Sequence, residues 1–400
     1  HTDPNAGISL YTYNGFDELI QSEDPSGQVR TFAYDELGRA VSVTDAAGVT
    51  QWIYDQGVNA LGRLSETIAP PTPENPFGQR EQYTYESGGR GLLARFDAII
   101  DGEEYPVTFT YDDLGRPKRI HYPNVGGGAP VVVEHTYSTS GILTGLDEVG
   151  TGTSRQLWRM QQVFQGHLLA RETFGNGAST TYGYDPDRHW IDSIETTFGG
   201  AQVQALEYSR NAGGLITARH ATGRDLREYT YDALNRLQST TTTPVGGAAE
   251  QVTYTYDTLG NITHTGQYAV GYHGTRKHQV TTVGPNSYQY NTSGNVRERS
   301  GPDIPGGLQT IEYTPFDLPR TISSGDLTTH FEYTADETRV VRRDIDRTRH
   351  FVGDLYQRVI SPTGDTLEER FRVQAGGRLI GEIVRADGAE RTLYAHTDHQ

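Results

Sequence analysis

The residues best suited to metal chemistry lie near the end of the chain, at His396, Asp398 and His399. In an extended strand His396 and Asp398 share one face, because successive side chains point to opposite faces. Two imidazoles and a carboxylate are ligands that zinc accepts. However, the HTDH sequence also belongs to a motif that repeats along the chain, which favours a structural role over metal binding. We therefore predict no bound metal and no cofactor, and keep these three residues as the one candidate site to test.

The acidic residues elsewhere do not suit acid–base catalysis. Asp35, Asp232 and Asp257 each follow a tyrosine in the same short phrase, and a catalytic carboxylate pair has no need to recur along a chain. Asp344 and Asp346 share a strand face, but arginines flank them, which indicates a solvated face with cross-strand ion pairs. We therefore predict no catalytic residues and no enzymatic activity.

The repeated motif that contains Asp35, Asp232 and Asp257 is the strongest signal in the sequence. It reads FAYDELGRA at 32–40, FTYDDLGRP at 109–117, YTYDALNRL at 229–237 and YTYDTLGNI at 254–262. Looser copies follow one another at intervals of about 20 to 25 residues, as expected for a stacked structural repeat. The signature residues are Tyr34, Asp35, Gly38, Arg39, Tyr111, Asp112, Gly115, Arg116, Tyr231, Asp232, Arg236, Tyr256, Asp257 and Gly260.

One repeat predicts a β-hairpin. Residues 30–34 alternate and carry aromatic side chains, as in a half-buried strand. Asp35 and Gly38 occupy the positions that a type I turn prefers, and residues 39–45 alternate again. We expect Asp to form the turn and Tyr to pack on the sheet, so that the tyrosines of successive hairpins form a ladder. Helical periodicity is nearly absent, and the whole chain is predicted to be β.

Composition excludes several function classes. The formal net charge is −17 and the isoelectric point is about 5.2. This acidic charge argues against binding to nucleic acid and against binding to anionic membranes. The chain has no cysteine, and no apolar run is long enough for a transmembrane helix. Hydrophobic residues make up only 34%, and the 25 tyrosines are the main apolar contribution. A sheet that is wetted on one face and encloses space fits this composition better than a solid core.

The repeats at 32–48 and 229–241 resemble the YD repeats of the Rhs family, which includes bacterial Rhs proteins and polymorphic toxins, the BC components of Tc toxins, and teneurins. The stretches at 350–360, 372–384 and 392–400 resemble the segment that leads into the Rhs-associated core, so we expect a fragment that ends just before that core. The resemblance implies a continuous curved or spiral sheet of hairpins that forms part of a hollow shell.

This resemblance sets our expectations for organisation. We expect residues 1–400 to form one continuous array of about 14–16 hairpins, with insertions near 66–80 and 264–286 and a final segment at 350–400 that leads into the core. The family's proteolytic and toxic elements lie outside this chain, so their activities are not carried over.

Three functions remain open from the sequence. The first is a non-catalytic scaffold of a secreted bacterial protein, whose partners are its own C-terminal toxin region, absent here, and the rest of the shell. The second is a cell-surface adhesion or carbohydrate-binding module, in which Trp52, Trp158 and Trp190 could stack on glycans. The third is a carbohydrate-active enzyme on a β-repeat scaffold, which should break the repeat with clustered acids. We expect a secreted or cell-surface location.

Overall fold

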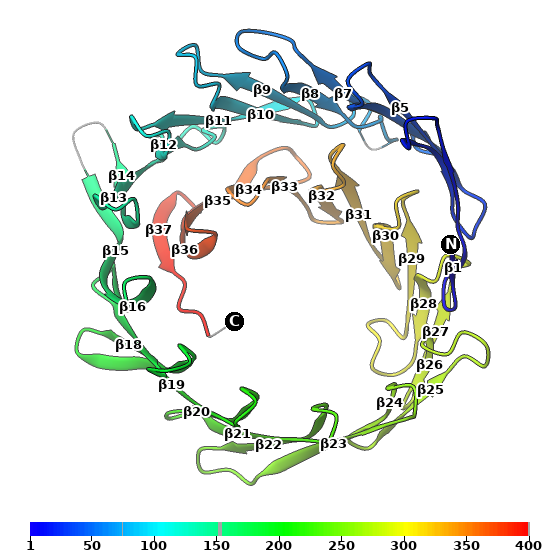
Figure 1. Cartoon of the computed structure of the whole chain (residues 1–400), viewed down its shortest axis with the longest axis vertical. Helices are drawn as coiled ribbons and strands as arrows, with labels where there is room; N and C mark the ends of the chain where they lie inside the picture. Colours follow the sequence, from blue (N-terminus) through cyan, green and yellow to red (C-terminus); the bar gives the residue numbers. More distant parts are fainter. Residues whose placement is uncertain (74, 151–153, 399–400) are drawn as a thin grey trace. The chain divides into compact units, whose positions relative to one another are not determined.

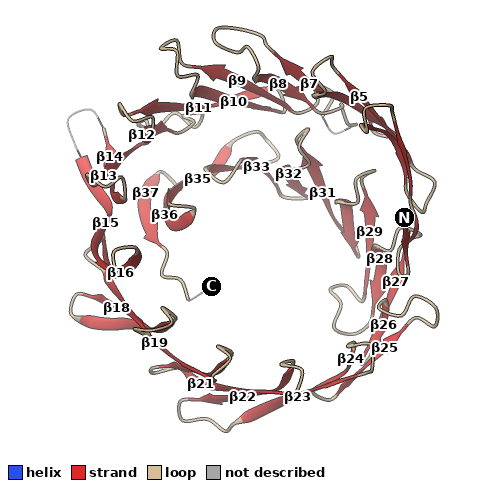
Figure 2. Cartoon of the chain, in the orientation of Figure 1, coloured by secondary structure: helices blue, strands red, loops and turns tan. Residues whose placement is uncertain are grey.

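The computed structural model describes residues 1–73, 75–150 and 154–398, and in those residues every regular element is a strand (Figure 2). Strands β1 to β37 are joined mostly by short turns, and consecutive strands pair antiparallel as hairpins (Figure 1). The predicted all-β fold of repeated hairpins is thereby confirmed. In the described residues no helix could span a membrane.

The described residues group into two compact units. Unit 1 comprises 1–132, 272–372 and 383–391, and unit 2 comprises 133–271, 373–382 and 392–398 as far as the structure describes it.

In unit 1, pairing follows chain order from β3 to β12 and again from β26 to β35. Its strands up to β12 are β1 (Thr2–Asp3), β2 (Gly7–Ile8), β3 (Leu10–Tyr13), β4 (Leu19–Glu23), β5 (Val29–Tyr34), β6 (Ala40–Asp45), β7 (Gly48–Tyr54), β8 (Leu64–Ile68), β9 (Arg80–Tyr85), β10 (Leu93–Ile100), β11 (Glu103–Tyr111) and β12 (Pro117–His121). The later strands are β26 (Val280–Val283), β27 (Asn286–Tyr290), β28 (Val296–Ser300), β29 (Leu308–Tyr313), β30 (Pro319–Ser324), β31 (Leu327–Tyr333), β32 (Arg339–Asp344), β33 (Arg347–Val352), β34 (Tyr356–Ile360) and most of β35 (Thr366–Ala375).

In unit 2, pairing follows chain order from β13 to β25. The strands are β13 (Val132–Tyr137), β14 (Leu143–Val149), β15 (Ser154–Phe164), β16 (Leu168–Phe174), β17 (Ser179–Tyr184), β18 (Ile191–Phe198), β19 (Ala201–Arg210), β20 (Ile216–Ala221), β21 (Asp225–Tyr231), β22 (Leu237–Pro244), β23 (Glu250–Tyr256), β24 (Ile262–Thr265) and β25 (Tyr268–Tyr272). The last strands, β36 (Arg378–Ala386) and β37 (Ala389–Tyr394), contribute residues to both units.

The core of unit 1 lies where β10 and β11 meet β33 to β35. The Tyr105 ring is 5.9 Å from the ring of Tyr356, which in turn is 5.2 Å from Phe371. All three side chains are almost completely buried. Two groups of hairpins that are far apart in the sequence therefore share one core within this unit.

The core of unit 2 lies on one face of β18 to β20. Ile194, Leu206, Tyr208 and Ala221 form a buried cluster, and partly buried apolar side chains pack against it. On β18, buried Ile194 and Thr196 alternate with the exposed Glu195, so this part of the strand turns one face to the cluster.

Candidate functional site: repeat turns and a buried polar network

The aspartate of each repeat closes the hairpin turn with its side chain. In the first copy, Asp35 Oδ1 accepts hydrogen bonds from the backbone N–H groups of Leu37 (2.9 Å) and Arg39 (3.0 Å). Asp35 Oδ2 accepts a third bond from Arg39 Nε at 2.7 Å. The same three bonds form at Asp112 and Asp232. The backbone hydrogen bond from Arg39 lowers the pKa of Asp35, so the carboxylate that makes the turn stays ionised.

The fourth position of the turn requires a left-handed backbone. Gly38 has φ of 75°, and Asn235, which replaces glycine in its repeat, has φ of 61°. The strand register shifts by one residue immediately before the tyrosine of the repeat, for example between Ala33 and Tyr34. A type I turn followed by a left-handed residue and a bulge is a common three-residue hairpin connection. The repeat motif therefore specifies one type of hairpin turn.

In nine repeats the tyrosine bonds to the preceding strand. The hydroxyl of Tyr34 donates to the carbonyl oxygen of Leu19 at 2.9 Å, and that of Tyr111 donates to Leu93 at 2.7 Å. The same type of bond is made by Tyr85, Tyr184, Tyr231, Tyr256, Tyr290, Tyr313 and Tyr333. Burial raises the pKa of Tyr111 above its ordinary value, which widens the pH range in which its hydroxyl is a donor.

The arginine of one repeat contacts the tyrosine of the next. The Arg39 guanidinium lies 4.3 Å from the ring centre of Tyr54, and Arg236 lies 4.2 Å from that of Tyr256. Arg39 also forms an ion pair with Asp55 at 2.6 Å. Such stacking stabilises exposed sites by about 0.5–1 kcal/mol. In these repeats aspartate, arginine and tyrosine thus connect one hairpin to the next.

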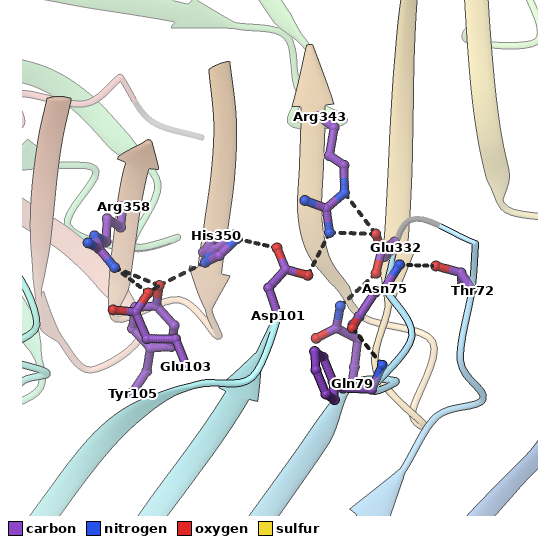
Figure 3. A network of polar contacts seen from close by, with 11 residues as sticks. Thr72, Asn75, Gln79, Asp101, Glu103, Tyr105, Glu332, Arg343, His350 and Arg358 are labelled. Carbon is purple, nitrogen blue, oxygen red and sulfur yellow. Dashed lines mark hydrogen bonds and ion pairs between the residues drawn. The ribbon is translucent and has the colours of Figure 1, made fainter. Parts of the chain in front are cut away.

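A second feature was not predicted from the sequence. In unit 1 a buried polar network joins the β10–β11 hairpin to β31–β34 and to the loop before β9 (Figure 3). Its members are Thr72, Asn75, Gln79, Asp101, Glu103, Tyr105, Glu332, Arg343, His350 and Arg358. Apart from Glu332, which lies in a looser copy of the repeat at 331–339, these residues are outside the repeat signature. The two groups of strands are about 250 residues apart in the sequence, as for Asp101 and His350.

Asp101 lies at the centre of this network. Its Oδ1 accepts from Arg343 Nη2 at 2.6 Å, and its Oδ2 is 3.0 Å from His350 Nε2. Burial by itself raises the pKa of Asp101, but the hydrogen bonds from His350 and Arg343 outweigh it and bring the pKa to about 2. Asp101 is therefore an anion held by two groups from the facing strands.

Tyr105 extends the network toward β34. Its hydroxyl is 2.8 Å from His350 Nδ1, donates to Glu103 at 2.9 Å and accepts from Arg358 at 3.2 Å. Burial raises the pKa of Tyr105, although Arg358 opposes the shift. Tyr105 is completely buried and His350 is only 2% exposed. An aspartate, a histidine and a hydroxyl in line have the elements of a nucleophile relay, but a group without access to substrate cannot serve as one.

Glu332 holds the other end of the network. Its Oε1 accepts two bonds from Arg343, and its Oε2 accepts from Gln79 Nε2 at 2.7 Å. The loop that carries Gln79 is itself ordered by Asn75, whose backbone N–H donates to Thr72 Oγ1 at 3.0 Å. The network therefore binds a long loop and two groups of strands together inside unit 1.

Unit 2 has a buried carboxylate of its own. Glu172 is fully buried and accepts hydrogen bonds from Tyr182 (2.6 Å), from Arg378 (3.1 Å) and from the indole of Trp158. Because Trp158 is only 4% exposed, it cannot be the sugar-stacking platform that the sequence left open.

Of the HTDH residues, the structure describes His396 and Asp398, and these two have separate partners. His396 packs edge-on against Phe174 with ring centres 4.8 Å apart, and burial lowers its pKa. Asp398 accepts a hydrogen bond from Tyr208 and lies 3.4 Å from Arg219 Nε. His399 lies outside the described residues. Within the described part, no three histidine, cysteine, aspartate or glutamate side chains are grouped to hold a metal.

Asp344 and Asp346 pair with arginines but do not share a strand face, contrary to the prediction. Asp344 is the last residue of β32 and accepts hydrogen bonds from Thr329 (2.8 Å) and Arg342 (3.0 Å). Asp346 lies in the turn between β32 and β33 and accepts from Arg347 at 2.9 Å. The two faces of a strand do not apply to Asp346, because β32 ends before it.

This geometry defines a protein built from one repeated β-hairpin whose turns and strand contacts recur along the chain. Comparison with known proteins agrees. Residues 13–50 match the RHS Repeat family model. The chain is 28% identical over 227 residues to Double-stranded DNA deaminase toxin A of Burkholderia cenocepacia (strain H111), which covers 54% of this chain and 14% of that toxin.

Solved structures show the same fold. The chain is similar to the crystal structure of TcdB2-TccC3-TEV, with a TM-score of 0.67, 15% identity, and coverage of 98% of this chain and 24% of that one. It is also similar to the Photorhabdus luminescens Tc holotoxin pore, with a TM-score of 0.51, 15% identity, and coverage of 94% and 24%. The resemblance to the Rhs/YD-repeat family is thereby confirmed: residues 13–50 match its repeat model, and the solved structures share the fold. The chain spans only a small part of each of these proteins.

Proposed function

We propose that the chain is a non-catalytic scaffold of a secreted bacterial Rhs-type protein, and that it forms part of a shell around a polypeptide, the C-terminal toxin region of its own parent. The observation that carries this proposal is the recurrence of one hairpin design. The same turn and the same tyrosine hydroxyl bond recur along the chain, and in some repeats an arginine also contacts the next tyrosine, as Arg39 does with Tyr54. Such a design extends a wall and does not assemble one reactive centre.

The comparisons support the proposal at a coarser level. The fold is that of Tc toxin components, and the relative from Burkholderia cenocepacia is a toxin by name. The deaminase activity is named for that relative, and the match covers only 14% of it, so we assign no deaminase residues to this chain. We expect the scaffold to act outside the cell that makes it, because the solved structures with this fold are toxin components.

The adhesion and carbohydrate-binding alternatives have less support. Trp158 is buried, the indole of Trp52 donates to Asp336 at 2.9 Å, and the ring of Trp190 is covered on one side by Arg188 at 4.8 Å. A sugar-binding platform needs an uncovered aromatic face. The carbohydrate-active enzyme alternative needs accessible paired acids, and the described acids discussed above are bonded to arginine, tyrosine or backbone groups.

Limited proteolysis of the full-length parent under native conditions tests the proposal. We expect the C-terminal region to resist digestion while the repeats remain folded, and to be cut after denaturation, because enclosure excludes the protease. A C-terminal region that is digested freely in the native protein would overturn encapsulation and favour an adhesion role.

A further inference from the structure

Two exposed histidines lie side by side in unit 2. His167 is in the turn between β15 and β16, and His189 is in the connection between β17 and β18. Their ring centres are 5.7 Å apart, and the ring planes are inclined by 68°. Neither histidine belongs to the HTDH residues or to the buried polar network, and the proposed scaffold role does not use them.

Contacts between the two hairpins hold these turns together. Gln165 Nε2 donates to the carbonyl oxygen of Pro186 at 3.1 Å, which joins one turn directly to the other. At the ends of the strands, the ring of Phe164 stacks on that of Tyr184 with centres 5.5 Å apart, and the Tyr184 hydroxyl donates to the carbonyl of Leu169 at 2.7 Å. The two histidines are therefore held near each other before any ligand binds, which lowers the free-energy cost of binding to both.

The backbone determines where the neutral His167 ring carries its proton. Its Nδ1 is 3.0 Å from the carbonyl oxygen of Gln165, and a carbonyl oxygen can only accept, so Nδ1 is the protonated nitrogen. The lone pair of Nε2 then remains for a ligand. Metal-binding histidines usually donate their other ring N–H to a carbonyl or carboxylate, which orients the ring and raises its basicity. His167 already has this arrangement.

His189 is positioned by its backbone and by a neighbouring ring. Its φ is 60°, and its backbone N–H donates to the carbonyl of Asp185 at 3.0 Å. The ring packs edge-on against Phe164, with centres 6.1 Å apart. In the part of the chain that the structure describes, the His189 ring makes no hydrogen bond. Either of its nitrogens can therefore turn toward His167 by rotation of the exposed ring.

The spacing of the two rings suits one shared metal ion. Zinc lies about 2.0–2.1 Å from an imidazole nitrogen, and therefore roughly 3.2 Å from the ring centre. Two rings on one ion, at bond angles from tetrahedral to about 125°, have centres roughly 5.2–5.7 Å apart. The observed separation of 5.7 Å falls at the upper end of this range. The adjacent cation, Arg188, lies over the ring of Trp190, and the net charge of −17 favours a cationic ligand.

We propose that His167 and His189 together bind one divalent transition-metal ion of the zinc type. Each ring supplies one nitrogen, and water completes the coordination, because the described residues group no three acidic, histidine or cysteine ligands. Imidazole suits zinc, nickel and copper, whereas magnesium and calcium prefer oxygen ligands, so the pair selects the first group. A two-ligand site on an exposed turn binds its metal reversibly, unlike a closed structural zinc site. The inference does not depend on the scaffold role, since it rests only on these two turns.

Titration of the whole chain with zinc chloride tests the proposal. All measurements use a His1→Ser background, because the N-terminal amine and the imidazole of His1 also chelate metals. Calorimetry should show one tightly bound zinc ion per chain. In protein labelled with ¹⁵N at histidine, the ring signals of His167 and His189 should shift together during the first equivalent of zinc, and magnesium chloride should leave them in place. The absence of zinc binding, or a shift of one of the two rings alone, would overturn the proposal.

Variants locate the site. Asparagine tolerates the left-handed backbone of His189, and in His167→Asn it keeps an N–H donor for the carbonyl of Gln165, so both variants should melt as the unchanged chain does without zinc. Each should weaken zinc binding at least about tenfold, and the double variant should bind about as weakly as each single one, because either change removes the chelate. His220→Asn, at an exposed histidine of β20, is the matched control and should leave affinity unchanged. An equal loss in His220→Asn, additive losses in the double variant, or a loss in His396→Asn with none in the pair would overturn the assignment.

Discussion

At the scale of single residues, the repeat aspartate and tyrosine do different work. Asp112 caps a turn with its side chain, whereas its neighbour Asp113 makes no comparable turn contacts. The tyrosine hydroxyl reaches a carbonyl oxygen on the previous strand, so it stabilises the contact between strands and not the turn.

Replacing the turn aspartate should destabilise its hairpin. We expect Asp112→Ala to lower the melting temperature by about 1–3 °C, because two backbone N–H groups and Arg116 lose their partner. Differential scanning calorimetry of Asp112→Ala beside Asp113→Ala measures the difference. Similar melting temperatures for the two variants would contradict the role of Asp112 in the turn.

Removing one tyrosine hydroxyl should also be measurable. In Tyr333→Phe the ring remains and the bond to the carbonyl of Pro319 is lost, so unfolding free energy should fall by about 0.5–1.5 kcal/mol. Tyr13→Phe is the matched control, because Tyr13 occupies the same repeat position but is 55% exposed. Urea denaturation of both variants checks the prediction, which fails if Tyr13→Phe costs as much.

At the scale of strands and hairpins, the sequence predicted the features that depend on contacts between residues close together in the chain. The turn at 35–39 was predictable because its hydrogen bonds join residues at most four positions apart. The pairing of Asp101 with His350 was not, because the partners are 249 positions apart and neither belongs to the repeat wording. A hairpin can be recognised from its own residues, but the strand group that it packs against cannot.

The buried polar network should contribute more to stability than surface ion pairs do. Arg343→Met leaves Asp101 and Glu332 without their shared cation and should cost about 3 kcal/mol of unfolding free energy. Arg347→Met removes an exposed pair with Asp346 and should cost less than about 1 kcal/mol. Chemical denaturation of the two variants compares them directly, and equal costs would show that the network is not a stabilising contact.

The low pKa of Asp101 gives this network a defined pH dependence. The folded pKa of about 2 is below the ordinary value of 3.8, so its contribution is complete above pH 4 and is lost as pH falls toward 2. After allowance for solvent screening, the loss should be about 1–2 kcal/mol. Urea unfolding from pH 5 to pH 3 should show a shallower decline for Asp101→Asn than for the unchanged protein. Asp326→Asn, on an exposed turn, should decline as the unchanged protein does.

At the scale of the whole molecule, the array combines many similar local contacts with a few unique ones. The sequence predicted the repeated part, but the division of contacts into two compact units follows from packing between distant segments. The extent of the predicted array over residues 1–400, with its roughly 14–16 hairpins, stays a prediction.

The two units can be followed separately by their tryptophans. Trp52 belongs to unit 1, and Trp158 and Trp190 belong to unit 2. In a background that keeps only Trp52, we expect Arg343→Met to shift the fluorescence unfolding transition to lower denaturant. In a background that keeps only Trp158 and Trp190, the same change should shift the transition less, because the contacts of Arg343 lie in unit 1. Equal shifts would mean that the chain unfolds as one cooperative body.

Pairing in chain order has a mechanical consequence. Where each strand's neighbours in the sheet are also its neighbours along the chain, tension applied to the ends detaches hairpins singly from the exposed end. A unit such as that from Tyr34 to Tyr54 spans 20 residues, so each rupture should lengthen the chain by roughly 70 Å. Single-molecule stretching should therefore give a regular sawtooth of small peaks, interrupted by a larger one where the contacts of Asp101, His350 and Arg343 break.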